Sequence, residues 1–214
     1  MTELFTVSKT LRFGWQTVRD RLGFFLAIVA ISVGVSLLPA GIQKFLEDGD
    51  PTFAFLAIIP AWVLGMVVQM GLILIPLRIC DGEDPELSDL FSCYDLVPRY
   101  ILASIAYMLL VSVGLLLLVV PGILWGIKYQ FFGYHIVDED AGALDSLRRS
   151  AEITQGAKGK LGWLFLALLG LNVAGFVCLL LGLLLTYAVT LVCCAFVYRR
   201  LCDHTPGDGG IAQS

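Results

Sequence analysis

Apolar and polar segments alternate along this chain, and the apolar segments are long. Six of them approach the length of about twenty residues that a helix needs to cross roughly 30 Å of hydrocarbon. Inside lipid every backbone N–H and C=O must be bonded within its own segment, so these runs are predicted to be helices. The predicted spans cover residues 22–40, 53–77, 100–120, 123–137, 161–180 and 183–198.

Shorter segments between the spans have the periodicity of amphipathic helices. In the first of them, Val7, Leu11 and Trp15 recur at helical spacing, whereas Lys9 and Arg12 occupy another face. A helix with one apolar and one basic face tends to lie in the headgroup plane; the alternative is a solvated lead-in to the first span. The predicted amphipathic helices cover residues 4–21, 86–97 and 141–155.

Each amphipathic helix precedes a pair of spans. The predicted fold is therefore an all-α integral membrane protein with six transmembrane helices, arranged as three hairpins that each follow a cytoplasmic interfacial helix. Thr10-Leu11-Arg12 in the first unit resembles Ser146-Leu147-Arg148 in the third, which favours an approximate threefold organisation. Residues 1–201 are predicted to be a single polytopic membrane domain.

Prolines and glycines are expected to mark the ends of these elements, because proline lacks a backbone N–H and glycine is conformationally permissive. Pro39 is predicted to end the first span, Pro98 to end the second amphipathic helix, and Pro121-Gly122 to form the turn before the fourth span. Gly182 is expected to be the hinge between the last two spans. Residues 202–214 are polar and are predicted to be a disordered tail.

Composition supports the membrane assignment and narrows the classes of function. Of the 214 residues, 58% are hydrophobic and 15% are charged, whereas soluble domains carry about 25% charged residues. The net charge of −4 gives no basis for nucleic-acid binding. No pair among the six cysteines has the spacing of a metal site. No catalytic, cofactor-binding or metal-binding residue is predicted, and no cofactor.

Basic residues are distributed unequally between the two sides of the predicted spans. Twelve lysines and arginines fall on the side that holds both termini, and Lys44 alone falls on the other. Cytoplasmic loops carry an excess of basic residues, so both termini of this multi-pass protein are predicted to lie on the cytoplasmic side of the cell (inner) membrane. The twelve are Lys9, Arg12, Arg19, Arg21, Arg78, Arg99, Arg148, Arg149, Lys158, Lys160, Arg199 and Arg200.

Lys128 is the sharpest candidate for a functional residue, because it lies near the middle of the short fourth span. Inserting a lysine at mid-membrane costs about 2.5–3.5 kcal/mol, and no acidic residue lies in any predicted span. Its ammonium group is expected either to meet an anionic headgroup or substrate inside the bundle, or to reach an interface or nearby carbonyl groups.

Four further polar residues within the predicted spans have two candidate roles. One is to join helices by hydrogen bonds worth about 0.6–2 kcal/mol each; the other is to line a transport pathway. These residues are Gln69, Gln130, His135 and Asn172.

Charged residues around the third amphipathic helix also have two candidate roles. A basic group is expected to contact anionic lipid, with about 1 kcal/mol for each charge near the surface, or else to be a solvated face that sets topology. Its members are Arg148, Arg149, Lys158 and Lys160. The acidic run Asp138-Glu139-Asp140 is expected to cap the helix at 141–155, rather than to form a metal site or catalytic pair.

The stretch from Pro121 to Lys160 resembles a known family. It contains Pro121-Gly122-Ile123, aromatic residues at Tyr129 and Phe132, Ile136-Val137-Asp138-Glu139, Gly142-Ala143-Leu144, Leu147-Arg148-Arg149-Ser150 and Thr154-Gln155-Gly156. The pattern resembles a bacterial and archaeal superfamily of uncharacterised six-helix membrane proteins, related to the membrane domain of glycerophosphoryl diester phosphodiesterases. Fused relatives carry the hydrolytic domain as a separate soluble barrel, and no polar region here is long enough for one. The resemblance therefore implies a stand-alone membrane module, and it does not imply phosphodiesterase activity.

These observations favour a non-enzymatic module that associates with the lipid bilayer, with other membrane proteins or with itself. The alternative is a small transporter or channel subunit that uses Lys128 and the midplane polar residues. A membrane-embedded lipid enzyme is the third hypothesis, since no base and nucleophile can be placed at one depth. A transporter should gather Gln69, Lys128, Gln130 and Asn172 around one wet cavity, whereas a scaffold should bury them pairwise in a dry core.

Overall fold

A computed structural model describes residues 6–45, 51–177 and 179–204. Within these ranges every regular element is helical, which confirms the predicted fold class at that level. The elements are α1 (Val7–Asp20), α2 (Leu22–Phe45), α3 (Pro51–Cys80), the 3₁₀ turns η1 (Leu87–Phe91) and η2 (Tyr94–Leu96), α4 (Val97–Leu117), α5 (Val119–Tyr129), α6 (Phe132–Glu139), α7 (Ala143–Ile153), α8 (Lys158–Val177) and α9 (Leu179–His204).

Five of the described helical segments are long and apolar enough to cross a membrane. They are Leu22–Lys44, Ala57–Cys80, Leu87–Leu117, Gly159–Val177 and Gly182–Asp203. The predicted fourth span, residues 123–137, is not among them, because it falls on two short helices, α5 and α6. Residues 130 and 131 form a turn between them, where α5 has ended and α6 has not begun.

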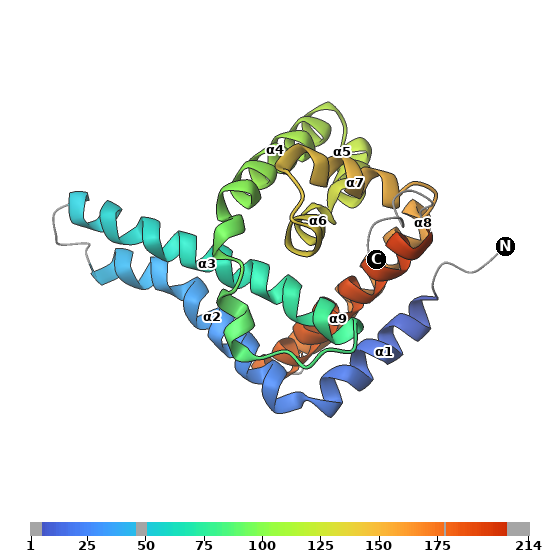
Figure 1. Ribbon diagram of the computed structural model, residues 1–214, viewed down its shortest axis with the longest axis horizontal. Helices are drawn as coiled ribbons and strands as arrows, with labels where there is room; N and C mark the ends of the chain where they lie inside the picture. Colours follow the sequence, from blue (N-terminus) through green and yellow to red (C-terminus); the bar gives the residue numbers. More distant parts are fainter. Residues whose placement is uncertain (1–5, 46–50, 178, 205–214) are drawn as a thin grey trace, which may run out of the picture.

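Helices that follow one another in the sequence pack as pairs: α2 with α3, α4 with α5, and α8 with α9. Figure 1 shows these pairs around the centre of the view, and α6 lies near that centre. The amphipathic segments join the pairs, because α1 packs on α9, η1 on α3, and α7 on α4 and α5. Helix α9 also contacts α2, α3 and α7, so it connects the first and last helix pairs.

Small residues allow two of these contacts to be close. A Cβ atom at Gly71 of α3 would lie 2.4 Å from the backbone of Leu90, so η1 rests directly on that helix. A Cβ atom at Gly14 of α1 would lie 2.6 Å from Sγ of Cys193 in α9. Both positions therefore exclude side chains, because packed interiors leave no room for an added carbon.

The expected helix ends are wrong at several prolines. Helix α2 continues through Pro39 to Phe45, and Pro98 lies in the first turn of α4. Pro121 is the third residue of α5, and the turn before that helix is at Leu118, whose φ and ψ are −167° and 145°. A proline in the first helical turn loses no bond, because its N–H would have no helical partner there.

Three other boundaries differ from the prediction. The segment 86–97 forms two 3₁₀ turns rather than an α-helix, with the Asp89 carboxylate accepting from the Glu86 N–H at 2.9 Å. Short acidic side chains compete in this way for backbone groups and favour caps and turns. Gly182 lies inside α9, which extends to His204, so residues 202–204 are helical; the rest of the predicted tail is outside the described residues.

Candidate functional site

The interruption between α5 and α6 leaves backbone groups without helical partners, and α7 supplies partners for them. The Ser150 hydroxyl donates to the Lys128 carbonyl at 3.1 Å and accepts from the Phe131 N–H at 3.1 Å. Thr154, one turn later, lies 3.1 Å from the same Lys128 carbonyl and 2.8 Å from the Ser150 carbonyl. A buried backbone group without a partner costs about 1–3 kcal/mol. These hydroxyls therefore make the interruption tolerable.

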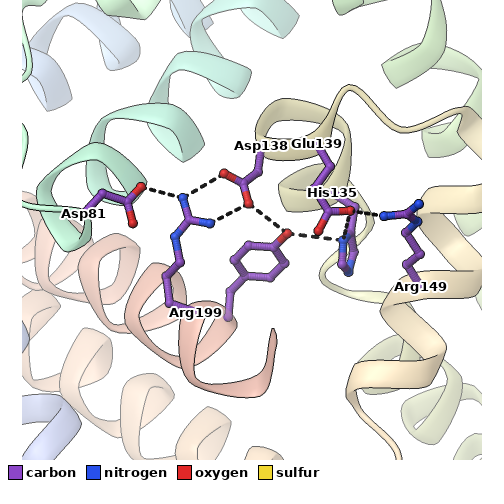
Figure 2. Close-up of polar contacts among 7 residues, drawn as sticks. Asp81, His135, Asp138, Glu139, Arg149 and Arg199 are labelled. Carbon is purple, nitrogen blue, oxygen red and sulfur yellow. Dashed lines mark hydrogen bonds and ion pairs between the residues drawn. The ribbon is translucent and has the colours of Figure 1, made fainter. Parts of the chain in front are cut away.

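A cluster of charged and polar side chains lies beside this interruption, and we call it the α6 junction. Its members are Asp81, His135, Asp138, Glu139, Arg149, Tyr198 and Arg199 (Figure 2). They come from the turn after α3 and from α6, α7 and α9. Four separate parts of the chain therefore meet in one polar network.

Arg199 forms the first half of the α6 junction. Its guanidinium donates to Asp138 through both terminal nitrogens, at 2.6 and 2.7 Å, and to Asp81 at 2.6 Å (Figure 2). A planar guanidinium matches a carboxylate in this two-bond geometry better than any other cation. The contact fastens α9 to α6 and to the end of α3.

His135 is the centre of the second half. Its Nδ1 donates to the Glu139 carboxylate at 3.1 Å, since a carboxylate can only accept, and Arg149 donates to the same oxygen at 2.6 Å (Figure 2). The Tyr198 hydroxyl lies 3.2 Å from that Nδ1 and donates to Asp138 at 3.2 Å. His135 and Tyr198 are almost completely buried. Together they connect the two halves.

Electrostatics at the α6 junction favour charged acids held by arginines. Burial by itself raises the pKa of Glu139, but His135 and Arg149 outweigh it and hold that pKa below its usual value. Nε2 of His135 has no hydrogen-bond partner among the described residues. No group of three His, Cys, Asp or Glu residues in the described ranges is arranged to hold a metal ion. The ion pairs of the junction join α6 to α7, to α9 and, through Arg199, to the end of α3.

The intramembrane polar residues singled out above contact different parts of the structure. Lys128 is half-buried at the end of α5, with its ammonium 5.0 Å from the centre of the Tyr129 ring. Asn172 of α8 donates to Thr190 of α9 at 2.8 Å. Gln69 is exposed on α3, whereas His135 belongs to the α6 junction.

Gln130 is half-buried at the interruption itself, directly after the last residue of α5. Its backbone has helical dihedral angles (φ −61°, ψ −24°), although the helix has ended. Lys128 and Gln130 are thus near one another in the chain, while Gln69 and Asn172 lie on other helices.

Both arginines of the basic group around α7 are paired with acids. Arg148 is exposed and bonds Glu152 one turn away, at 3.1 Å, and Arg149 bonds Glu139. Lys160 is exposed near the start of α8. Lys158 is the first residue of α8, and its side chain lies outside the described set.

The acidic run plays a different part from the expected one. Helix α7 begins after Gly142 without a side-chain cap. Asp138 and Glu139 instead lie in α6 and bond Arg199 and Arg149. Asp140 ends α6 with φ 52° and bonds Arg99. The capping expectation is therefore wrong. These carboxylates bond arginines from other parts of the chain, and Gly142 is the residue at the start of α7.

Sequence reasoning missed several members of the site. Ser150 and Thr154 carry a local signal, since two hydroxyls one turn apart fall on the buried face of an amphipathic helix. No local signal in the sequence marks the other missed members, Asp81, Tyr198 and Arg199. Only the packing of α3 and α9 brings them to α6.

Comparison with known proteins places this site within a described domain. The family model named "Domain of unknown function (DUF7847)" matches residues 94–206, which is more than half of the chain and includes α6, α7 and α9. The chain belongs to this family. It is also similar to the UPF0259 membrane protein SG1383 of Sodalis glossinidius (strain morsitans), with 33% identity over 95 residues. That alignment covers 44% of this chain and 38% of the relative. No solved structure matches.

Membership of the DUF7847 family and the named relative agree with the apolar helices. The chain is a multi-pass membrane protein with several membrane-spanning helices. The Asp81 end of the α6 junction lies outside the matched residues, while its other six members lie inside them.

Proposed function

We propose that this DUF7847 protein is a non-enzymatic module of the cell (inner) membrane that associates with lipids or with membrane-protein partners. The observation that carries the proposal is the separation of its intramembrane polar groups: Asn172 of α8 bonds Thr190 of α9, and His135 of α6 bonds Tyr198 of α9. Polar side chains that bond other helices act as connections between them. The arginines of the α6 junction are likewise bonded to acids.

The surface of the helix pairs also supports association with lipid. Large apolar side chains are exposed along α4, including Leu102, Met108 and Leu116, and Leu116 is 92% exposed. Apolar surface of this extent is stable only against hydrocarbon or a partner protein. The module therefore offers either of them a broad face.

The proposal includes six crossings in three hairpins, with both termini in the cytoplasm. Besides the five long helices, the fourth crossing in chain order is the interrupted segment 123–137, whose free backbone groups are bonded by α7. Interrupted helices at membrane depth are tolerated where protein covers them. The relation to the membrane domain of glycerophosphoryl diester phosphodiesterases is part of this proposal, as a shared architecture rather than a shared reaction.

A transporter or channel subunit is the second candidate, because Lys128 lies beside the α5–α6 interruption. Broken helices in transporters often form ion or substrate sites. Against this candidate, the exposed Gln69 and the bonded Asn172 lie on other helices from Lys128 and Gln130.

A reconstitution experiment separates the two candidates. The full-length protein is placed in lipid vesicles, and fluxes of protons, potassium and inorganic phosphate are compared with protein-free vesicles. We expect no added flux from the parent or from Lys128→Met, and phospholipid retained on the detergent-purified parent in native mass spectrometry. A flux in the parent that Lys128→Met removes would establish the transporter instead.

A further inference from the structure

Arginines on the side that holds the termini are mostly bonded to acids of the same side. The arginine ion pairs in the described residues are Arg21–Asp84, Arg78–Glu83, Arg78–Asp89, Arg99–Asp140, Arg148–Glu152, Arg149–Glu139, Arg199–Asp81 and Arg199–Asp138. Three cations of α1 differ from them. Lys9, Arg12 and Arg19 form no ion pair with any acid in the described ranges.

These three cations share one face of α1. The opposite face packs against α9 through Thr10, Gly14 and Val18, all of which are buried. Lys9, Arg12 and Arg19 are exposed, together with Gln16 and a single acid, Asp20, at the end of the helix. The outward face therefore carries three positive charges and one negative charge.

Helix α1 lies directly beside two of the membrane-spanning helices. The helix ends at Asp20, and the span Leu22–Lys44 begins two residues later. Phe13 stacks on Phe196 of α9, with ring centres 4.7 Å apart, and Cys193 donates to the Thr10 carbonyl. Both α9 residues lie inside the span Gly182–Asp203. Helix α1 thus lies along the side of a membrane-spanning helix.

Trp15 adds a second property of a membrane-surface helix. It is 45% exposed, beside the basic residues on the same helix. Indole rings gather at the boundary between headgroups and hydrocarbon, where their apolar and polar parts are both satisfied. A basic face with an exposed tryptophan is the pattern of helices that bind anionic lipid surfaces.

We propose that the outward face of α1, formed by Lys9, Arg12, Trp15 and Arg19, binds the phosphate groups of anionic phospholipids. The inference rests on the proposed function and specifies its lipid partner. It assigns anionic-lipid binding to α1 in place of the basic group around α7, whose arginines are already bonded to acids. Arginine donates two parallel bonds to phosphate oxygens, and lysine adds a point charge.

The test compares two triple variants of the full-length protein in detergent. One is Lys9→Gln, Arg12→Gln and Arg19→Gln; the matched control is Lys44→Gln, Arg148→Gln and Lys160→Gln, which removes three exposed charges elsewhere. Binding of phosphatidylglycerol and of phosphatidylcholine is measured by native mass spectrometry. A basic side chain that contacts the phosphate of a bound lipid contributes about fivefold to its binding. The α1 variant should therefore lose ~100-fold in phosphatidylglycerol affinity, and the control, whose charges lie outside the proposed face, less than ~5-fold.

A single-residue variant distinguishes a loss of lipid contacts from misfolding, because it is expected to raise the affinity. Asp20→Asn leaves the cations in place and should raise phosphatidylglycerol affinity by about fivefold. Equal losses in both triple variants, or no gain with Asp20→Asn, would overturn the proposal. Phosphatidylcholine binding should be the same in all variants. A parent that retains neither lipid would contradict the proposed function itself, which distinguishes the two failures.

Discussion

Helices α1 and α7 open the first and third units of the chain, and each buries a small polar residue near its start. Thr10 donates to the Thr6 carbonyl at 3.2 Å, and Ser146 donates to the Ala143 carbonyl at 2.8 Å. Four residues later the two helices differ. Gly14 of α1 touches α9, whereas Ser150 of α7 bonds the backbone between α5 and α6.

This difference shows how one amphipathic pattern serves two purposes. On α7 the buried face carries hydroxyls that complete another helix, and the charges outside it are balanced by Glu139 and Glu152. On α1 the closest contact of the buried face is made by Gly14, which has no side chain. The cations of its exposed face, Lys9, Arg12 and Arg19, have no acid partner in the described ranges. The arginines of α7 are paired with acids of the same chain, while α1 presents outward charge that is unpaired among the described residues.

Removing the α7 hydroxyls should have the largest effect. Ser150→Ala combined with Thr154→Val leaves the Lys128 carbonyl and the Phe131 N–H without partners. We expect a loss of about 3 kcal/mol in the free energy of unfolding, measured by denaturant titration in detergent. Ser8→Ala on the exposed face of α1 is the control and should change little. An unchanged double variant would mean that α7 does not complete the interruption.

Filling the α1 contact should have the next largest effect. A Cβ atom at Gly14 would lie 2.6 Å from the Cys193 sulfur and 3.2 Å from the Val189 carbonyl. Gly14→Ser, which copies the α7 residue, should therefore cost about 2 kcal/mol through overpacking. Thermal unfolding in detergent measures it, with Gly159→Ser in open space as the control. Equal melting temperatures for Gly14→Ser and Gly159→Ser would show that the contact of α1 with α9 does not require glycine at residue 14.

The two helices also show what the sequence could and could not predict. Periodicity was sufficient for the amphipathic faces of α1 and α7, and the length of the apolar runs for the long spans, because both follow from local burial. It was not sufficient for residues 86–97, which form 3₁₀ turns. The α5–α6 interruption was not predictable, because residues 123–137 are apolar throughout except for Lys128, Gln130 and His135. The partners that stabilise it are Ser150 and Thr154, about twenty residues later.

The candidate site was predictable only in part. His135 was recognised as an intramembrane polar group, and Arg149 as a surface charge. Their meeting at Glu139 depends on the fold of α6 against α7. Arg199 is more distant still, since it reaches Asp81 and Asp138 only after α9 has crossed α3. Charge counting predicted its side of the membrane and could not predict its partner.

A smaller effect should follow from removing the α7 ion pair at the junction. Glu139→Gln should cost about 1 kcal/mol at neutral pH, because the pair is partly exposed. The pKa of Glu139 is lowered in the folded protein, so the unfolded chain takes up the proton first as pH falls. The difference between parent and variant should be constant above pH 5 and should shrink below about 4.5. A difference that grows on acidification would contradict the assignment.

Arg148→Gln should have the smallest effect. Its bond to Glu152 joins two exposed side chains one turn apart on α7. Such pairs contribute about 0.3–0.5 kcal/mol, so the melting temperature should fall by no more than about 1–2 °C. The same substitution at Arg12 should leave stability unchanged, because that side chain has no acid partner in the described ranges. A larger fall in melting temperature for Arg12→Gln than for Arg148→Gln would show that the Arg12 side chain stabilises the fold, which contradicts the account.

The central claim is that α1 and α7 lie on the cytoplasmic face of a multi-pass membrane protein. Two topology reporters test it most directly, one active only in the cytoplasm and one active only outside it. Each reporter is placed at both positions, after Ser214 and after Asp48. The account predicts a cytoplasmic signal at Ser214 and an external signal at Asp48. A cytoplasmic signal at Asp48 would contradict it.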